Sequence, residues 1–228
     1  MDLEHKLKIV LEKIEVAKKK SSFKQKVELI AATKTRDISQ IEKCYSLGVT
    51  SIGENRVQEA ENKFVDFQGF KTLKKRFIGH LQSNKINKCL DLFDTIDSVD
   101  TFKTANKINN ASQKRTQKTE CLIEINTSGE PQKNGFSPTI SNELISCFSL
   151  QNLEIVGLMT IGPNTSDEKK IKNSFSALRD LKDKINQELG RNILKELSMG
   201  MTNDFELGVE EGSTMVRVGT GLFGSRDY

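Results

Sequence analysis

Lys34 follows the strand-like run Val27–Thr33 and is the residue of this chain whose chemistry is easiest to anticipate. An amine at the end of a buried apolar strand is poorly solvated, and desolvation lowers the pKa of a lysine below its usual value of about 10.4. The neutral amine attacks aldehydes and ketones and forms a Schiff base. A lysine at a strand end more often only marks where the strand meets solvent, so this chemistry needs support from other residues.

Two glycine-containing segments give that support: Ser198–Thr202 reads SMGMT, and Arg217–Gly221 reads RVGTG. Glycine lets backbone N–H groups approach an anion closely, and Ser198 and Thr220 can add hydroxyl donors. Each segment alone is weak support, because glycines at strand ends usually only turn the chain. A Schiff-base lysine together with a phosphate-binding cup is what pyridoxal 5′-phosphate requires, so the sequence predicts this cofactor.

Further polar residues follow other strand-like runs. Asn55 could hydrogen-bond a ring oxygen of a planar ligand. His80 could be an acid or base or could cap a helix, and both His80 and Met159 are candidates for lining the site. Three carboxylates at such positions could do acid/base work, although orienting neighbours or forming ion pairs is the commoner role; they are Glu54, Glu59 and Glu124.

The elements that must position these residues alternate along the chain. After an amphipathic opening helix, strands are expected at Val27–Thr33, Val49–Ile52, Arg76–Ile78, Thr95–Ile96, Cys121–Ile125, Ile155–Met159, Leu197–Ser198 and Met215–Val218. Helices are expected between them, at Ile38–Leu47, Arg56–Phe67, Thr101–Ser112, Pro138–Phe148, Lys169–Glu188 and Asp204–Glu211.

This alternation predicts βαβ units, and eight of them close into a single (β/α)8 barrel of the α/β class. A doubly wound open sheet is the alternative. With three prolines and no low-complexity linker, residues 1–228 are expected to form one domain, with residues 1–22 as a helix on the barrel wall. Barrels of this kind place functional groups after the C-terminal ends of their strands and often bind phosphate after strands seven and eight. Lys34 and both glycine-containing segments occupy such positions.

Composition excludes several classes of protein. The 35 basic and 31 acidic residues are interspersed and leave a net charge of only +4, which argues against nucleic-acid binding. No run approaches the roughly 20 apolar residues of a membrane span, and the N-terminus, MDLEHKLK, is too charged for a secretory signal. The four cysteines show neither a CxxC pair nor a neighbouring histidine, which argues against a metal site and for free thiols in the cytoplasm.

Seven motifs, in order, resemble those of the pyridoxal phosphate homeostasis proteins. They are AATK (31–34), GENRVQE (53–59), FIGHLQSNK (77–85), LIEIN (122–126), GLMTI (157–161), SMGMTNDF (198–205) and GSTMVRVGTGLFG (212–224). The resemblance extends over nearly the whole chain. It implies a single (β/α)8 barrel like the barrel domain of bacterial alanine racemase, the fold-type III class of pyridoxal-phosphate proteins.

By this resemblance Lys34 carries the cofactor as a Schiff base, and Asn55 lies near its ring. Arg217 faces the pyridine nitrogen, where a cation disfavours protonation and makes the ring a weaker electron sink. Carbanion chemistry of the transaminase type would then be poorly supported. The remaining implied contacts belong to the phosphate and its loop; they are Ser198, Met199, Gly200, Gly219 and Thr220.

The resemblance also implies a protein without dedicated catalytic activity that takes part in intracellular vitamin B6 and amino-acid homeostasis, with apo-enzymes as candidate recipients of the cofactor. The alternative is an amino-acid racemase or lyase. Alanine racemases use a tyrosine from a second domain opposite the lysine, whereas Tyr45 and Tyr228 lie at no predicted strand end and no such domain is expected here. A Schiff-base aldolase for phosphosugars is a third hypothesis. We expect a monomer.

The sequence departs from the family pattern at a few positions. Thr33 and Thr202 stand where serine is common, and both keep a hydroxyl, so binding should be intact. Arg56 stands where tyrosine is frequent, and Lys75 and Arg76 replace a frequent Trp-His pair. These three residues are expected to alter the site entrance or the surface.

Overall fold

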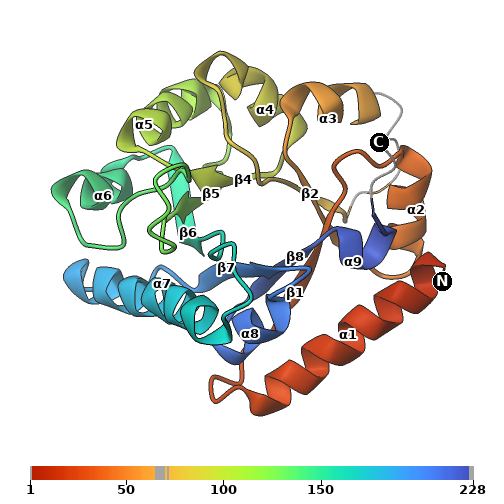
Figure 1. Cartoon of the computed structure of the whole chain (residues 1–228). Coiled ribbons are helices and arrows are strands. Elements are labelled where there is room, and N and C mark those ends of the chain that lie inside the picture. The colour runs from red at the N-terminus through yellow and green to blue at the C-terminus, as the bar shows by residue number, and fades with distance from the viewer. Residues whose placement is uncertain (1, 65–69, 71, 226–228) are drawn as a thin grey trace.

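Eight parallel strands form a closed barrel in chain order, with β8 pairing to β1 (Figure 1). The computed structural model describes residues 2–64, 70 and 72–225. The strands are β1 (Glu28–Ala32), β2 (Ser51–Glu54), β3 (Lys74–Phe77), β4 (Thr95–Val99), β5 (Thr119–Glu124), β6 (Leu153–Met159), β7 (Glu196–Met201) and β8 (Met215–Val218). The predicted (β/α)8 barrel is therefore confirmed, and the open sheet is excluded. Each strand lies within a few residues of its expected position.

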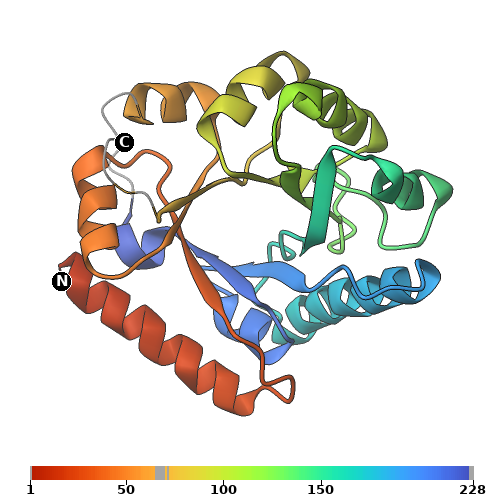
Figure 2. The ribbon, with the colours of Figure 1, turned by 180° about the vertical axis from the view of Figure 1, so that it is seen from behind.

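Helices surround the barrel on its outer side (Figures 1 and 2). They are α1 (Leu3–Lys20), α2 (Ile38–Ser46), α3 (Val57–Phe64), α4 (Ile86–Leu92), α5 (Phe102–Ala111), α6 (Asn142–Ser146), α7 (Glu168–Glu188), α8 (Phe205–Glu210) and α9 (Thr220–Phe223). The prediction missed α4 and α9, which are too short to show a helical period. Residues 65–67 of the expected third helix lie outside the described residues.

Helix starts follow side-chain caps. The carboxylate of Asp37 accepts a hydrogen bond from the backbone N–H of Gln40 at 3.0 Å and so begins α2. Ser141 caps α6 in the same way, through the N–H of Leu144 at 3.2 Å. The helix expected from Pro138 therefore begins only at Asn142, because a capping residue has extended rather than helical backbone angles.

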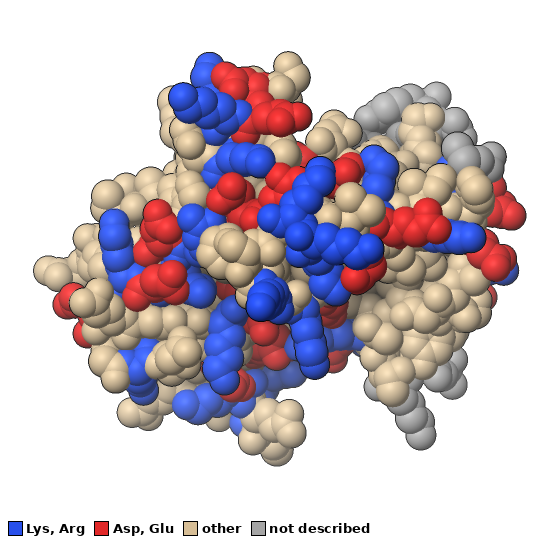
Figure 3. Space-filling model, turned by 90° about the horizontal axis from the view of Figure 1, so that it is seen from below, with Lys and Arg blue, Asp and Glu red and all other residues tan. Residues whose placement is uncertain are grey.

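The opening helix α1 packs against α8 and α9 through its buried residues Leu7, Val10, Ile14 and Ala17. Its apolar stripe thus covers the outside of the barrel next to β8. No helix in the described part of the chain is both long and apolar enough to cross a membrane. Basic and acidic side chains lie intermingled on the face seen in Figure 3, in keeping with the balanced composition.

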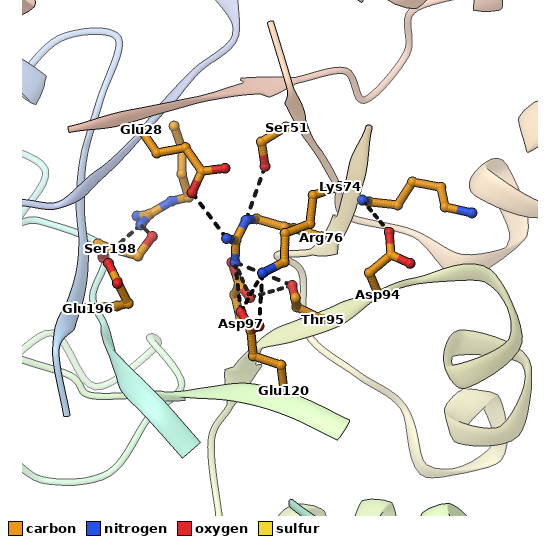
Figure 4. Close-up of polar contacts among 12 residues, drawn as sticks. Glu28, Ser51, Lys74, Arg76, Asp94, Thr95, Asp97, Glu120, Glu196 and Ser198 are labelled. Atoms are coloured by element: carbon orange, nitrogen blue, oxygen red, sulfur yellow. Dashed lines mark hydrogen bonds and ion pairs between the residues drawn. The ribbon is translucent and has the colours of Figure 1, made fainter. Parts of the chain in front are cut away.

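Inside the barrel, side chains from alternate strand positions form layers. Ile30, Leu122, Met159 and Met215 make an apolar middle layer. Below it, at the beginnings of the strands, lies a polar cluster around Arg76 (Figure 4). The C-terminal ends of the strands lie above it.

The Arg76 guanidinium is 2% exposed and donates to Ser51 Oγ at 3.1 Å, to Glu28 Oε2 at 3.1 Å and to both oxygens of the fully buried Asp97 at 3.3 Å. The expectation that Arg76 alters the site entrance or the surface is wrong, whereas Lys75 lies at the surface, one of its two expected places. Arg76 points into the barrel at the N-terminal ends of the strands, away from Lys34. Lys75 points outward and places its Nζ 5.6 Å from the ring centroid of Phe64.

Candidate cofactor site

A cavity of about 860 Å³ opens at the C-terminal ends of β1, β2 and β3. Three of the predicted site residues, Lys34, Asn55 and His80, line it together. The other lining residues are Thr35, Arg36, Arg56, Val57, Gln58, Glu59, Phe77, Gln82 and Lys85. Since Glu59 is the sole carboxylate among these lining residues, the cavity has a cationic wall suited to an anionic ligand.

A buried ion pair holds the exits of β1 and β2 together. Lys63 Nζ donates to Glu54 Oε1 at 2.5 Å and to the backbone oxygen of Thr33 at 2.8 Å, and the Thr33 hydroxyl donates to the same Glu54 oxygen at 2.7 Å. Burial raises the pKa of Glu54, and the neighbouring Lys63 opposes that shift. Lys63 therefore stabilises the charged form of a fully buried carboxylate next to the residue that precedes Lys34.

The turn that carries Lys34 is fixed by the same cluster. Thr35 has a left-handed backbone with φ of 64°, and its N–H donates to Glu59 Oε1, which also accepts from Lys63 at 3.2 Å. A non-glycine residue in this conformation is retained only where surrounding bonds stabilise it. Lys63 is not among the residues expected from the sequence, where its one signal is the (i, i+4) spacing from Glu59 on a helix.

The C-terminal ends of the strands form the mouth of the barrel. On the β8 side of this mouth lies the cation Arg217. Its side chain, 5% exposed, donates to the backbone oxygen of Ser198 at 2.8 Å, to Ser198 Oγ at 2.6 Å and to the backbone oxygen of Thr160 at 2.7 Å. Burial lowers the pKa of Arg217, while Asp97, Asp204 and Glu124 act in the opposite direction. These hydrogen-bond acceptors are all neutral, so the arginine retains an electrostatic preference for an anion.

The predicted phosphate loops lie beside Arg217. Thr202 Oγ1 accepts from the N–H groups of Gly219 and Gly221 at 3.3 and 3.2 Å and so joins the two loops. The Thr220 side chain is exposed at the end of β8, and the buried Ser198 hydroxyl retains its own proton for donation. Gly219 lies next to the β1 exit, because a Cβ on it would lie 3.4 Å from the backbone oxygen of Ala32.

Two candidates are buried away from the cavity. The Met199 side chain is fully buried in the core between the barrel and its helices, so only the backbone of this residue can face the phosphate loop. Met159 belongs to the apolar middle layer and is 1% exposed, which places it beneath the site. Gly200 has φ of 100°, and a Cβ there would lie 2.7 Å from Cα of Phe205, so only glycine allows this turn to pack.

Asn55 provides a test of fit for the cofactor. Its Oδ1 atom is buried at the cavity and accepts no hydrogen bond from the described residues. A buried polar atom without a partner is costly, and a donor group of a ligand at this position would satisfy it. A Cβ at Gly79 would lie 2.2 Å from the Asn55 backbone oxygen, so glycine is required to bring the β3 exit this close. The donor set around Asn55, Lys34 and the β7–β8 loops fits a hydroxyl-bearing aldehyde phosphate.

Three titratable groups complete the mouth on the far side. His80 Nδ1 lies 3.1 Å from Asp100 Oδ2, and Glu124 is 6% exposed at the end of β5. Burial and the nearby Asp100 raise the pKa of Glu124 to about 7. The sequence singled out Glu124 but missed Asp100, which only the closed barrel brings near it.

The architecture and this mouth together define a class: a (β/α)8 barrel with a lysine at the end of its first strand and loops suited to phosphate after its last two. The family model for alanine racemase, N-terminal domain, matches residues 7–227. The chain is 36% identical over 225 residues to the pyridoxal phosphate homeostasis protein of Aquifex aeolicus, covering 98% of each chain. It is 37% identical over 232 residues to that of Haemophilus influenzae, covering 100% of this chain and 98% of the relative.

A solved structure of PipY from Synechococcus elongatus with pyridoxal phosphate bound is also similar. It superposes with a TM-score of 0.83 at 29% identity, covering 98% of this chain and all of that one. The chain belongs to the pyridoxal phosphate homeostasis protein family, and the family membership expected from its motifs is confirmed.

Proposed function

We propose that this protein holds pyridoxal 5′-phosphate as a Schiff base on Lys34 and takes part in intracellular vitamin B6 and amino-acid homeostasis. The observation that carries the proposal is the cavity in which Lys34 and the unpartnered Asn55 Oδ1 meet, beside the loops after β7 and β8. The bound cofactor in PipY and the names of the relatives support it. The cofactor would supply a reactive aldehyde.

Each residue has a role that follows from its surroundings. Lys34 supplies the amine, and the Glu54–Lys63 pair positions the turn on which it stands. Asn55 Oδ1 accepts a hydrogen bond from the ligand. The phosphate is held by hydroxyl and backbone donors, which are those of Ser198, Gly200, Gly219 and Thr220.

Arg217 is assigned to the pyridine nitrogen. It bonds Ser198 and Thr160 and has no carboxylate at hydrogen-bonding distance within the described residues, so it presents a positive charge to a ligand. A cation there disfavours protonation of the ring and weakens it as an electron sink. We therefore infer a binding protein without dedicated catalysis, acting as a single-domain cytoplasmic monomer that can pass the cofactor to apo-enzymes.

The test compares Lys34→Ala with Lys85→Ala, a second lysine of the same cavity. Wild-type protein incubated with pyridoxal phosphate should absorb in the visible, and borohydride should trap one pyridoxyl group on the peptide that contains Lys34. Lys34→Ala should lose both signals, and Lys85→Ala should keep them. A colourless wild type in the presence of excess cofactor would contradict the proposal.

An amino-acid racemase or lyase is the second candidate, favoured by the match to the racemase domain and by the titratable groups opposite Lys34. It predicts incorporation of solvent deuterium at the α-carbon of an amino acid at turnover rates. Absence of exchange across the common amino acids would leave the homeostasis function in place.

A further inference from the structure

Glu124 lies in the mouth of the barrel on the side opposite Lys34. On β5, Glu120 bonds Lys74 at the N-terminal end of the barrel and Leu122 belongs to the apolar middle layer, so Glu124 is the third residue of the same inward-facing row. In the closed order of eight strands, β5 lies four positions from β1 in both directions. The carboxyl group of Glu124 is therefore directed into the mouth across from the lysine.

The carboxyl group of Glu124 is largely buried, since the residue is only 6% exposed. Within residues 2–64, 70 and 72–225 it makes no hydrogen bond or ion pair. Burial removes most of the hydration of an ionised carboxylate and so disfavours the charged form.

The charged groups around Glu124 come from several elements. Asp100 after β4 disfavours its ionisation, whereas Arg217 on β8 and His80 after β3 favour it. His80 is itself paired with Asp100 at 3.1 Å. The β6 neighbour of Glu124 is the uncharged Met159, and in the segment after β5 Glu130 and Lys133 pair with each other at 3.1 Å. With these influences combined, the pKa of Glu124 rises to about 7, so the group exchanges its proton near neutral pH.

The charge on Glu124, together with those of Asp97 and Asp204, determines how strongly the positive charge of Arg217 acts on a ligand. When Glu124 is ionised it attracts Arg217 and repels an incoming anion. When it is protonated, the positive charge of the buried guanidinium, whose bonds go to neutral oxygens, acts on the anion without that opposition. Linkage is reciprocal, so an anion that binds better to the protonated site must also raise the proton affinity of Glu124.

We propose that Glu124 is a proton-exchanging residue of the site. Binding of an anionic ligand in the barrel mouth is then coupled to the uptake of a proton from solvent by the Glu124 carboxylate. The ligand class is a small phosphate monoester. The proposal deepens the proposed function, on which it rests for the natural ligand, by making cofactor retention depend on pH through a residue of β5.

The experiment uses the full chain and pyridoxine 5′-phosphate, a probe that has the phosphate but an alcohol in place of the aldehyde and so cannot form a Schiff base. Calorimetric titrations at pH 7.5 in two buffers of different ionisation enthalpy measure the protons taken up on binding. Wild type should take up more protons than Glu124→Gln. Between pH 6.5 and 8.5 its affinity should fall roughly fivefold relative to that variant. Glu154→Gln, at an exposed position on the neighbouring strand β6, is the matched control and should behave as wild type.

A second variant keeps the test decisive if Glu124→Gln does not fold. Asp100→Asn removes the like charge that acts on Glu124, so the pH midpoint of the affinity change should move downward. Equal proton uptake in wild type and Glu124→Gln, or a midpoint that Asp100→Asn leaves in place, overturns the inference. If the inference is overturned in this way but wild type still forms the visible adduct with pyridoxal phosphate under the same conditions, the proposed function is left intact. Loss of the adduct itself would count against the proposed function instead.

Discussion

At the scale of single residues, the site is built from charges that the barrel has removed from water. Glu54 is fully buried, and its charged form is stabilised by Lys63, whose Nζ lies 2.5 Å from Glu54 Oε1. Arg217 is buried against neutral acceptors, and Glu124 is buried near Asp100. The first pair supplies rigidity beside Lys34. Within the described part of the chain, the charges of Arg217 and Glu124 are not balanced by a bonded partner of opposite charge, so a ligand can interact with them.

We predict that Lys63→Met lowers the free energy of unfolding by about 3–5 kcal/mol at pH 8, because it leaves Glu54 as an unpaired buried charge. Burial raises the pKa of Glu54, so the native state takes up its proton more readily than the unfolded chain. The loss should therefore be largest above the raised pKa and should shrink as the pH falls and Glu54 is protonated. Urea unfolding followed by circular dichroism at pH 5 and pH 8 measures this.

Lys88→Met is the matched control for that change. Lys88 pairs with Glu61 at 2.6 Å, but on the surface, with its side chain 45% exposed. An exposed pair contributes little, so the variant should stay close to wild type at both pH values. An equal loss in the two variants would show that the Lys63 pair has no special role.

At the scale of elements, the strand exits determine the shape of the site. The exit of β3 approaches that of β2 so closely that a Cβ at Gly79 would overlap the Asn55 backbone oxygen, and Ser98 Oγ donates to the Gly79 oxygen at 2.5 Å. β7 and β8 are joined above the barrel through Thr202. Two pairs of neighbouring strands thus bound the candidate site from opposite sides of β1.

Gly79→Ala should move the β3 exit away from Asn55, with a cost of about 1–3 kcal/mol from overpacking. Since Asn55 and His80 would both shift, the affinity for pyridoxal phosphate should fall together with stability. Thermal unfolding and visible absorbance measure the two effects.

Gly129→Ala serves as the comparison for Gly79→Ala. Gly129 has φ of 71° with nothing within 4 Å of its Cβ position, so alanine there meets only backbone strain. It should lose some stability and keep its affinity. Unchanged affinity in Gly79→Ala would mean that the β3 exit does not position the ligand.

At the scale of the whole molecule, the layers between barrel and helices protect the thiols. Cys44, Cys89, Cys121 and Cys147 are free and fully buried. Burial raises the pKa of Cys44 to about 11 and that of Cys147 to about 12, and it raises the pKa of the other two thiols as well.

The folded protein should therefore react slowly with a thiol reagent at pH 8, because thiolate is scarce and access requires opening of the barrel wall. All four cysteines should react at once in denaturing urea. Counting modified thiols by mass spectrometry with and without urea measures this. Rapid labelling of one cysteine in the native state would show local opening at its helix.

The sequence by itself determined the barrel, the place of Lys34 and the two loops after β7 and β8, because these depend on local periodicity and on glycines and polar residues at strand ends. The short helix α4 and the place of Arg76 could not be predicted from the sequence. A short helix shows no clear period, and the type of a strand residue does not say whether its side chain points into the barrel or outward. Only the tertiary structure decided that Lys63 pairs with Glu54 and that Glu124 faces Asp100 and Arg217. Glu124, Asp100 and Arg217 come from three different parts of the chain and share one low-dielectric mouth only when eight strands close, and burial there raises the pKa of Glu124 and lowers that of Arg217.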